Sequence, residues 1–143
     1  MMGAGIIVVK WVGSWKVLAL EAPAYIKNKN NGKYDIPKGQ IDPGENAWQT
    51  AVREAYEEAS LILGHQEVIF GPMKDKWLTV WICEVPDSEN IDILPNPDTN
   101  IYEHESFHWL SFAEMANDCY SYLKPFITRA EQTLQTHSTL YTT

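Results

Sequence analysis

Three glutamates stand close together in one segment of the chain, and their spacing favours metal chemistry. Glu54, Glu57 and Glu58 are three and four residues apart, so in a helix they would share one arc of the surface. Like charges at these spacings destabilise an isolated helix, whereas a divalent cation with oxygen ligands would relieve the repulsion. Because Mg²⁺ often binds a few carboxylates together with substrate phosphates, phosphate-ester chemistry is one interpretation. A solvated acidic helix face is the other, and the cluster alone does not separate them.

The element that must carry these glutamates is a helix, predicted over residues 47–59. Asn46, with Gln49 three residues later, has the pattern of a capping box at the helix start. An apolar stripe at helical spacing is formed by Trp48, Val52, Ala55 and Ala59. We expect this helix to pack through the stripe and to present its carboxylates on a separate arc.

Five further segments have the apolar patterns of β-strands. They are residues 6–9, 16–20, 67–70, 77–85 and 106–110. Gly13 and Ser14 lie between the first two segments and predict a hairpin. The fourth segment is almost continuously apolar, which predicts a central strand.

The remaining segments are predicted to be two loops and two helices. Residues 27–33 lack a periodic pattern, and residues 86–100 are rich in proline and acidic side chains, so both are expected to be loops. Ser111 and Glu114 form a capping-box pattern for a short helix. A C-terminal helix is predicted, ahead of a polar tail from about Thr136, by Leu123, Phe126, Ile127, Ala130 and Leu134.

The spacing of the whole segment 39–61, GQIDPGENAWQTAVREAYEEASL, narrows the interpretation. It resembles the Nudix box, Gly-x5-Glu-x7-Arg-Glu-U-x-Glu-Glu-x-Gly-U with U apolar, at every defined position except Ser60. The family has glycine there, and serine in a left-handed conformation would cost roughly 1–2 kcal/mol. The resemblance implies an α/β Nudix fold, a mixed β-sheet sandwiched between helices, in a single domain over residues 1–143. It also implies metal-dependent hydrolysis of a nucleoside diphosphate linked to another group.

The resemblance further implies a role for each residue of the box. The ligands of Mg²⁺ or Mn²⁺ would be the Gly39 carbonyl, Glu54, Glu57 and Glu58. Arg53 would orient a glutamate by a salt bridge, either Glu45 or Glu57; the alternative is an ordinary helix pair with Glu57, worth about 0.3–0.5 kcal/mol. A carboxylate would take the proton of the attacking water, and Glu57 and a glutamate outside the box are the two candidates.

A second segment points to one branch of the family. Residues 103–110, EHESFHWL, are similar to the EHxxYxWL segment of asymmetric dinucleoside tetraphosphate hydrolases, with Phe107 in place of tyrosine, and residues 37–45 match PKGxxxPGE. That branch would convert diadenosine tetraphosphate to ATP and AMP. Glu103 would then bind metal or act as the base, and His104 would donate to a phosphate. Their alternatives are a solvated loop glutamate and a surface histidine.

Binding of the nucleotide itself would need cations for phosphates and a flat apolar partner for the base. Lys38 adjoins the metal loop and could hold a phosphate as a point charge, and Lys76 precedes a predicted strand. Both could equally be solvated lysines. Tyr102, Trp77 and Tyr120 are candidates for stacking on adenine, although most aromatic side chains pack in cores.

Composition limits the classes of function. The chain has 143 residues, 45% of them hydrophobic, and a net charge of −8. The apolar content excludes a disordered chain, and the acidic balance argues against nucleic acid or anionic membranes as partners. Cys83 and Cys119 form no CxxC pair and are expected to be buried thiols in a reducing compartment. We expect a cytoplasmic enzyme with a small-molecule nucleotide substrate and no membrane segment; the oligomeric state is not predicted.

Three other functions are compatible with parts of this evidence. A (d)NTP pyrophosphohydrolase would use the same box and release pyrophosphate. An RNA 5′-pyrophosphohydrolase would also use it, but long RNA prefers a basic track. A binding module without catalysis is a different class, and the presence of all three box glutamates argues against it.

Overall fold

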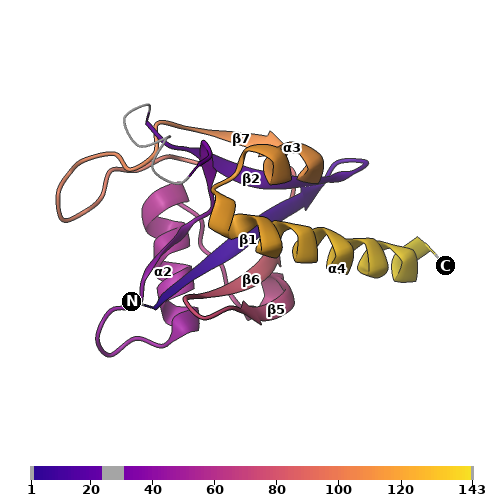
Figure 1. Ribbon diagram of the computed structural model, residues 1–143, viewed down its shortest axis with the longest axis horizontal. Helices are drawn as coiled ribbons and strands as arrows, with labels where there is room; N and C mark the ends of the chain where they lie inside the picture. Colours follow the sequence, from indigo (N-terminus) through magenta and orange to yellow (C-terminus); the bar gives the residue numbers. More distant parts are fainter. Residues whose placement is uncertain (1, 24–30, 143) are drawn as a thin grey trace.

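The computed structural model describes residues 2–23 and 31–142 (Figure 1), so most of the predicted loop at 27–33 lies outside the described residues. The strands in the described part of the chain are β1 (Gly3–Trp11), β2 (Trp15–Glu21), β3 (Tyr34–Asp35), β4 (Lys38–Gln40), β5 (Val68–Lys74), β6 (Leu78–Glu84) and β7 (Ser106–Leu110). The helices are α2 (Ala47–Ala59), α3 (Phe112–Asp118) and α4 (Lys124–Thr142), with single 3₁₀ turns at His65–Glu67 and Ser121–Leu123.

These strands form one mixed sheet in the order β3-β2-β1-β6-β5. β1 and β6 run parallel, and the other pairs are antiparallel. β6 has a strand on each side, which confirms its predicted central position, whereas β7 adds to the outer edge of β2. The β1–β2 hairpin at Gly13 and Ser14 also forms as predicted.

β1 and β2 pair at the hairpin end and then separate, and the short strands β3 and β4 fill the gap. β2 pairs with β3 at Leu20 and Glu21, and β1 pairs with β4 from Gly3 to Gly5. The two backbones approach so closely that a Cβ at Gly5 would collide with the Pro37 carbonyl and the Lys38 side chain. The segment of residues 34–40 is thereby fixed at one end of the sheet.

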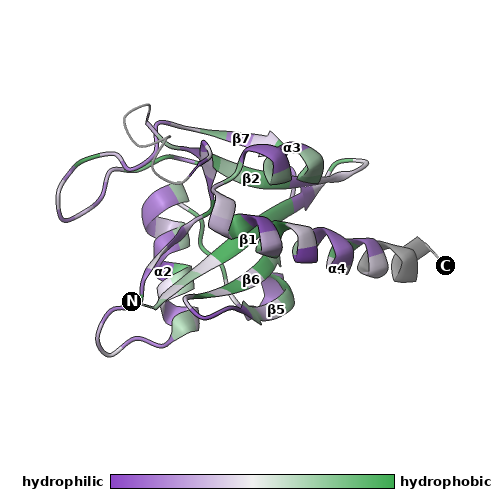
Figure 2. Ribbon diagram, in the orientation of Figure 1, coloured by the Kyte–Doolittle hydropathy of each residue, from purple (hydrophilic) through white to green (hydrophobic). Residues whose placement is uncertain are grey.

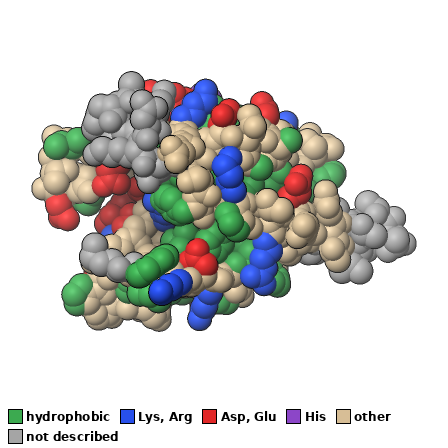
Figure 3. Space-filling view, viewed as in Figure 1, with side chains coloured by type: hydrophobic (Ala, Val, Ile, Leu, Met, Phe, Trp, Pro, Cys, Tyr) green, Lys and Arg blue, Asp and Glu red, His purple; other side chains and the backbone are tan. Residues whose placement is uncertain are grey.

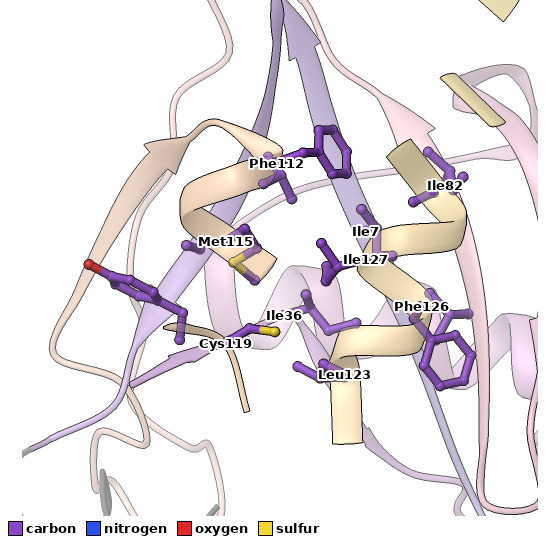
Figure 4. Close-up of a cluster of buried hydrophobic side chains, with 14 of the residues drawn as sticks. Ile7, Ile36, Ile82, Phe112, Met115, Cys119, Leu123, Phe126 and Ile127 are labelled. Carbon is purple, nitrogen blue, oxygen red and sulfur yellow. The ribbon is translucent and has the colours of Figure 1, made fainter. Parts of the chain in front are cut away.

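The sheet separates two hydrophobic cores because successive side chains of a strand point to opposite faces. Ile7 and Val9 of β1 belong to the core under α3 and α4, whereas Ile6 and Val8 belong to the core under α2. Figure 4 shows the first core, in which Phe126 and Ile127 of α4 lie near residues of the sheet and of α3. In Figure 2 much of β1, β2 and β6 is coloured as hydrophobic, whereas the loop that leads into α2 is largely hydrophilic. The predicted mixed sheet between helices is confirmed.

α2 has the predicted bounds and the predicted capping box. Asn46 Oδ1 accepts from the Gln49 N–H at 2.8 Å, and Gln49 Oε1 accepts from the Asn46 N–H at 2.9 Å. The predicted apolar stripe is shifted, because Ala51 is buried beside Ala55 and Ala59 while Val52 is only half-buried. The buried face of α2 also includes Glu58.

The helices at the C-terminal end form largely as predicted. Ser111 and Glu114 make the capping box of α3. All five apolar positions predicted for the last helix are buried: Leu123, Phe126, Ile127, Ala130 and Leu134. The backbone of α4 continues to Thr142, through the segment predicted to be a polar tail.

Several element boundaries differ from the predictions. β5 begins at Val68 because Glu67 belongs to a 3₁₀ turn, and β6 begins at Leu78, which leaves Trp77 exposed. β3 and β4 are absent from the sequence predictions because strands of two and three residues carry no periodic pattern. Cys83 and Cys119 are buried free thiols, as predicted. Within the described residues, no helix is both long enough and apolar enough to span a membrane.

Candidate active site

A cleft of about 490 Å³ opens between α2, β4 and the long loop that connects β6 to β7. Most of the predicted site residues line it, namely Lys38, Gly39, Arg53, Glu54, Glu57, Glu58, Glu103 and His104. It is also lined by residues that the sequence did not single out: Gln40, Asp42, Leu94, Asn96, Pro97 and Asp98. Figure 3 shows acidic side chains gathered in a hollow beside the long loop.

Arg53 is the centre of one charged group, which we call the Arg53 cluster and which consists of Glu45, Arg53, Glu54 and Glu57. The guanidinium holds Glu45 with two hydrogen bonds, from Nε at 2.9 Å and from Nη2 at 3.0 Å. Its Nη1 also donates to Glu54 at 2.9 Å and to Glu57 at 3.1 Å. Both partners considered in the sequence are therefore engaged, together with Glu54, which was not anticipated as a partner. A planar fork of donors is required for this arrangement, and lysine would not supply it.

The surroundings of Glu45 and Glu54 in the Arg53 cluster shift their pKa values in opposite directions. The hydrogen bond from Arg53 lowers the pKa of Glu45 from its ordinary 4.5 to about 2. Burial acts in the opposite direction at Glu54 and raises its pKa to about 7, with a further contribution from the neighbouring Glu57 charge. Glu45 is therefore ionised at neutral pH. The pKa of Glu54 lies near neutral, because the positive charge of Arg53 does not offset the effect of burial.

Gly39 lies directly against this carboxylate. A Cβ at position 39 would collide with the side-chain carboxylate of Glu54, so a larger residue there would displace this carboxylate from its place beside β4. The close approach supports the pairing of the Gly39 loop with the box helix. The role of the Gly39 carbonyl as a metal ligand stays a prediction.

A second charged group lies deeper, and we call it the buried cluster: Asp35, Lys38, Glu58 and His104. Lys38 Nζ and His104 Nε2 both lie 3.2 Å from Asp35 Oδ2. The other ring nitrogen of His104 lies 3.5 Å from Glu58 Oε2, and Glu58 Oε1 accepts from the Lys38 backbone N–H at 2.8 Å. The four residues come from β3, β4, α2 and the long loop, so the cluster joins the elements that surround the cleft.

Burial controls the ionisation of the buried cluster. It raises the pKa of Glu58 well above its ordinary value, an effect increased by the charges of Asp35 and Glu54. The pKa of Asp35 is lowered even though burial opposes this, because Lys38 and His104 stabilise the ionised form. His104 is 4% exposed, and each of its ring nitrogens faces a carboxylate. It is therefore not a surface histidine; its predicted donation to a phosphate stays a prediction.

Asp35 is the member of the buried cluster that sequence reasoning missed. It occupies a strand of two residues, 3 residues before Lys38, and belongs to no recognised motif. A signal was present, because an acidic residue between the apolar Tyr34 and Ile36 must find a partner when it is buried.

The remaining predicted binding residues lie elsewhere. Lys76 extends over the exposed ring of Trp77, with Nζ 5.3 Å from its centroid. Trp77 lines a second cleft of about 330 Å³, together with Tyr122, and Lys38 and Gly39 line both clefts. Tyr102 is exposed on the long loop and is absent from the lining of either cleft.

Tyr120 is placed differently from the other two aromatic candidates. It is 4% exposed and belongs to the core under α4. The more exposed Tyr122 beside it, which the sequence did not select, faces the second cleft instead.

The family follows from these features and from comparison with known proteins. The model of the NUDIX domain matches residues 1–130, which include the whole sheet, the box helix and the cleft. The chain therefore belongs to the Nudix hydrolase family.

Curated relatives are similar to this chain over about half of its length. The asymmetrical bis(5′-nucleosyl)-tetraphosphatase of Mus musculus is 33% identical over 87 residues, which are 54% of this chain and 55% of that protein. The enzyme of the same name from Caenorhabditis elegans is 30% identical over 82 residues, 51% of this chain and 54% of that protein. The chain thus spans about half the length of the curated relatives it matches.

Solved structures agree with the fold over nearly the whole chain. The C. elegans Ap4A hydrolase binary complex has a TM-score of 0.71 at 19% identity and covers 94% of this chain and 98% of its own. The MutT protein from Methanosarcina mazei Go1 has a TM-score of 0.60 at 16% identity, covering 92% and 93%. At these identities the comparison establishes the fold.

Nudix hydrolases generally require divalent metal ions, and the donor set of the cleft suits one. The three box glutamates Glu54, Glu57 and Glu58 line the same cleft, and the pKa values of Glu54 and Glu58 are raised by burial and by neighbouring negative charges. A cation with oxygen ligands would relieve this repulsion. In the part of the chain that the structure describes, no group of three acidic, histidine or cysteine side chains is already placed to hold a metal ion, and Arg53 engages Glu54 and Glu57.

Proposed function

We propose that this chain hydrolyses diadenosine tetraphosphate to ATP and AMP, using Mg²⁺ or Mn²⁺. The observation that carries the proposal is a single cleft in which the box glutamates and Lys38 lie together with Glu103 of the second motif. The names of the curated relatives, tetraphosphatases of the asymmetrical type, support the choice of substrate.

We infer different roles for the acidic and the basic residues of the cleft. Glu54, Glu57, Glu58 and the Gly39 carbonyl would hold the metal, which when bound neutralises phosphate charge and acidifies water. Arg53 keeps Glu54 and Glu57 beside the cleft through its hydrogen bonds. Lys38 would bind a phosphate oxygen, since the residue lines the cleft and its interaction with Asp35 keeps the side chain protonated. Glu57 or Glu103 would accept the proton of the attacking water.

The second cleft supplies a place for one nucleoside. Trp77 and Tyr122 line it, and Lys38 and Gly39 connect it to the first cleft. A base stacked on an aromatic face gains about 1–3 kcal/mol, and its phosphates would then extend past Lys38 toward the box glutamates. We therefore propose Trp77 for stacking rather than Tyr102, which lines neither cleft, or Tyr120, which is buried.

The test is a competition among nucleotides in one reaction. The purified protein is incubated with Mg²⁺ and equal concentrations of diadenosine tetraphosphate, dGTP, dATP and ADP-ribose, and the products are resolved by anion exchange. Early ATP and AMP are the expected products. Early release of dNMP and pyrophosphate would contradict the substrate assignment and favour a (d)NTP pyrophosphohydrolase.

The position of water attack gives a second measurement. In H₂¹⁸O, attack on the phosphorus four positions from the bound nucleoside, with ATP as the leaving group, places the label in AMP. Attack on the third phosphorus would place the label in ATP if AMP leaves, or would give two molecules of ADP if ADP leaves. The same reaction with Glu57→Gln serves as the control for contaminating phosphatases. Competition by long RNA against the dinucleotide would instead favour an RNA substrate.

A further inference from the structure

The long loop that connects β6 to β7 forms one wall of the cleft, and it is attached to the body of the protein. Ile91 is buried in the core under α2. Ser60 Oγ donates to the Asp92 carbonyl at 3.1 Å, and the Asp92 N–H donates to the Ala59 carbonyl at 3.2 Å. At the other end of the loop, His104 belongs to the buried cluster. The middle of the loop therefore extends from two fixed points, as Figure 1 shows.

Asn96 organises this middle part. Its Oδ1 accepts from the Asp98 N–H at 2.8 Å, its backbone N–H donates to the Ile101 carbonyl at 2.9 Å, and its carbonyl accepts from the Asn100 N–H at 2.7 Å. A backbone N–H can only donate, so the side-chain atom that faces Asp98 must be the amide oxygen. The turn therefore also determines where the amide NH₂ group points.

The amide NH₂ group points at Glu103. Asn96 Nδ2 donates to Glu103 Oε1 at 2.8 Å, and both residues line the cleft with the box glutamates. The charge of Glu103 contributes to the raised pKa of Glu54, which shows that the two carboxylates are within electrostatic reach. Hydrogen bonds to a carboxylate are among the stronger ones in proteins.

We propose that Asn96 is a positioning residue, whose amide holds the Glu103 carboxylate toward the box glutamates across the cleft. The inference rests on the proposed function, because it concerns the site of that reaction. An amide suits both tasks, since its oxygen closes the turn and its nitrogen holds the carboxylate. Aspartate would still close the turn, but it would place one carboxylate against another.

Two substitutions separate these tasks. In Asn96→Ser the hydroxyl can still accept from the Asp98 N–H, but the side chain is too short to reach Glu103. In Asn96→Asp the new carboxylate repels the carboxylate of Glu103. Because partners that orient a site residue are typically worth 10–100-fold in activity, we expect kcat to fall about 10-fold in Asn96→Ser and about 100-fold in Asn96→Asp, with little change in KM. Asn90→Ser and Asn90→Asp are matched controls at an exposed position of the same loop and should keep the wild-type rate.

A kinetic cycle with Glu103→Gln tests whether Asn96 acts through Glu103. We expect Asn96→Asp to have little further effect once Glu103→Gln is present. An equal loss in both backgrounds would mean that Asn96 only shapes the loop and would overturn the inference. A wild-type rate in Glu103→Gln would overturn it as well, while leaving the hydrolysis itself intact.

A measurement without substrate separates this inference from the proposed function. The side-chain amide signal of Asn96 in a ¹H–¹⁵N spectrum, assigned by its disappearance in Asn96→Ser, should shift in Glu103→Ala. An unchanged signal would show that the hydrogen bond is absent and would overturn the inference. Because this result does not depend on turnover, a wild-type protein that hydrolyses none of the nucleotides would contradict the proposed function alone.

Discussion

The Arg53 cluster and the buried cluster meet at one cleft, but they differ in how they hold their charges. In the Arg53 cluster the side chains of Arg53 and Glu57 are each 27% exposed, and the guanidinium is shared among the three glutamates of the cluster and Asp42, which lies 3.3 Å from it. In the buried cluster Asp35 and His104 are 7% and 5% exposed, and each polar group faces a defined partner. The first arrangement can exchange partners when a charged ligand enters, whereas the second fixes the elements that form the cleft. Substitutions in the Arg53 cluster should therefore affect mainly activity, whereas those in the buried cluster, which also supplies Lys38 and Glu58 to the cleft, should affect stability as well.

The largest expected effect on activity comes from the Arg53 cluster. Glu57→Gln keeps the shape of the side chain but removes the charge of a proposed metal ligand. We expect kcat to fall by more than about 100-fold, because even residues that only orient such ligands are worth 10–100-fold. The melting temperature should change little, since Glu57 is partly exposed. A kcat close to that of the wild type would contradict the metal assignment.

The largest expected effect on stability comes from the buried cluster. Asp35→Asn leaves Lys38 and His104 facing each other without the intervening negative charge. Breaking a buried ion pair by removing one partner typically costs 3–5 kcal/mol. Because the Lys38 side chain is 19% exposed, we expect a loss of about 3 kcal/mol in the free energy of unfolding, measured by urea titration.

A surface ion pair provides the matched control for Asp35→Asn. Asp87, which is 68% exposed, pairs with Lys10 at 2.8 Å. Asp87→Asn removes the same kind of charge and should cost less than about 1 kcal/mol. Equal losses in the two variants would mean that the buried cluster does not stabilise the fold in the way its burial suggests.

The same contrast explains what the sequence could predict of the site. The Arg53 cluster lies within one helix and the loop before it, so fixed spacing along the chain determines its geometry. The buried cluster combines Asp35, Lys38, Glu58 and His104, and only tertiary structure brings them together. Lys38, Glu58 and His104 were selected from motifs, but Asp35, the common partner of Lys38 and His104, has no motif. Its role depends on the gap between β1 and β2, which no local pattern indicates.

The fold shows a similar division. α2 was predicted to its terminal residues because the capping box and the helical period agree. The burial of the Glu58 side chain was not predicted, since an isolated helix gives no reason to bury a carboxylate. Lys38 and His104 on other elements provide that reason. The second cleft was missed for a related reason, because Tyr122 is adjacent to it only after α4 packs on the sheet.

A moderate effect is expected from acid, and the part of it that comes from the Arg53 cluster can be isolated at Glu45. The pKa of Glu45 is lowered to about 2 from its ordinary 4.5 by Arg53. A lowered pKa means that the folded state releases the proton more readily, so the contribution to stability is present above pH 4.5 and is lost as the pH falls toward 2. In Glu45→Gln this part of the pH dependence should disappear. If the wild type and Glu45→Gln lose stability in parallel between pH 4.5 and 2, the ionised pair with Arg53 is not responsible.

The smallest expected effect lies at Ser60, where the end of the box helix meets the long loop. Ser60 has φ = 61°, a left-handed conformation that costs a serine roughly 1–2 kcal/mol. Its hydroxyl donates to the Asp92 carbonyl, and such a bond contributes about 0.5–1.5 kcal/mol. Glycine would remove both the strain and the bond, so we expect Ser60→Gly to unfold within about 1 kcal/mol of the wild type. Ser60→Ala keeps the strain and loses the bond, and should be less stable by about 1 kcal/mol in the same urea titration. Wild-type stability in Ser60→Ala would show that the hydroxyl does not fasten the loop, and the loop would then depend on Ile91 and the buried cluster for its position.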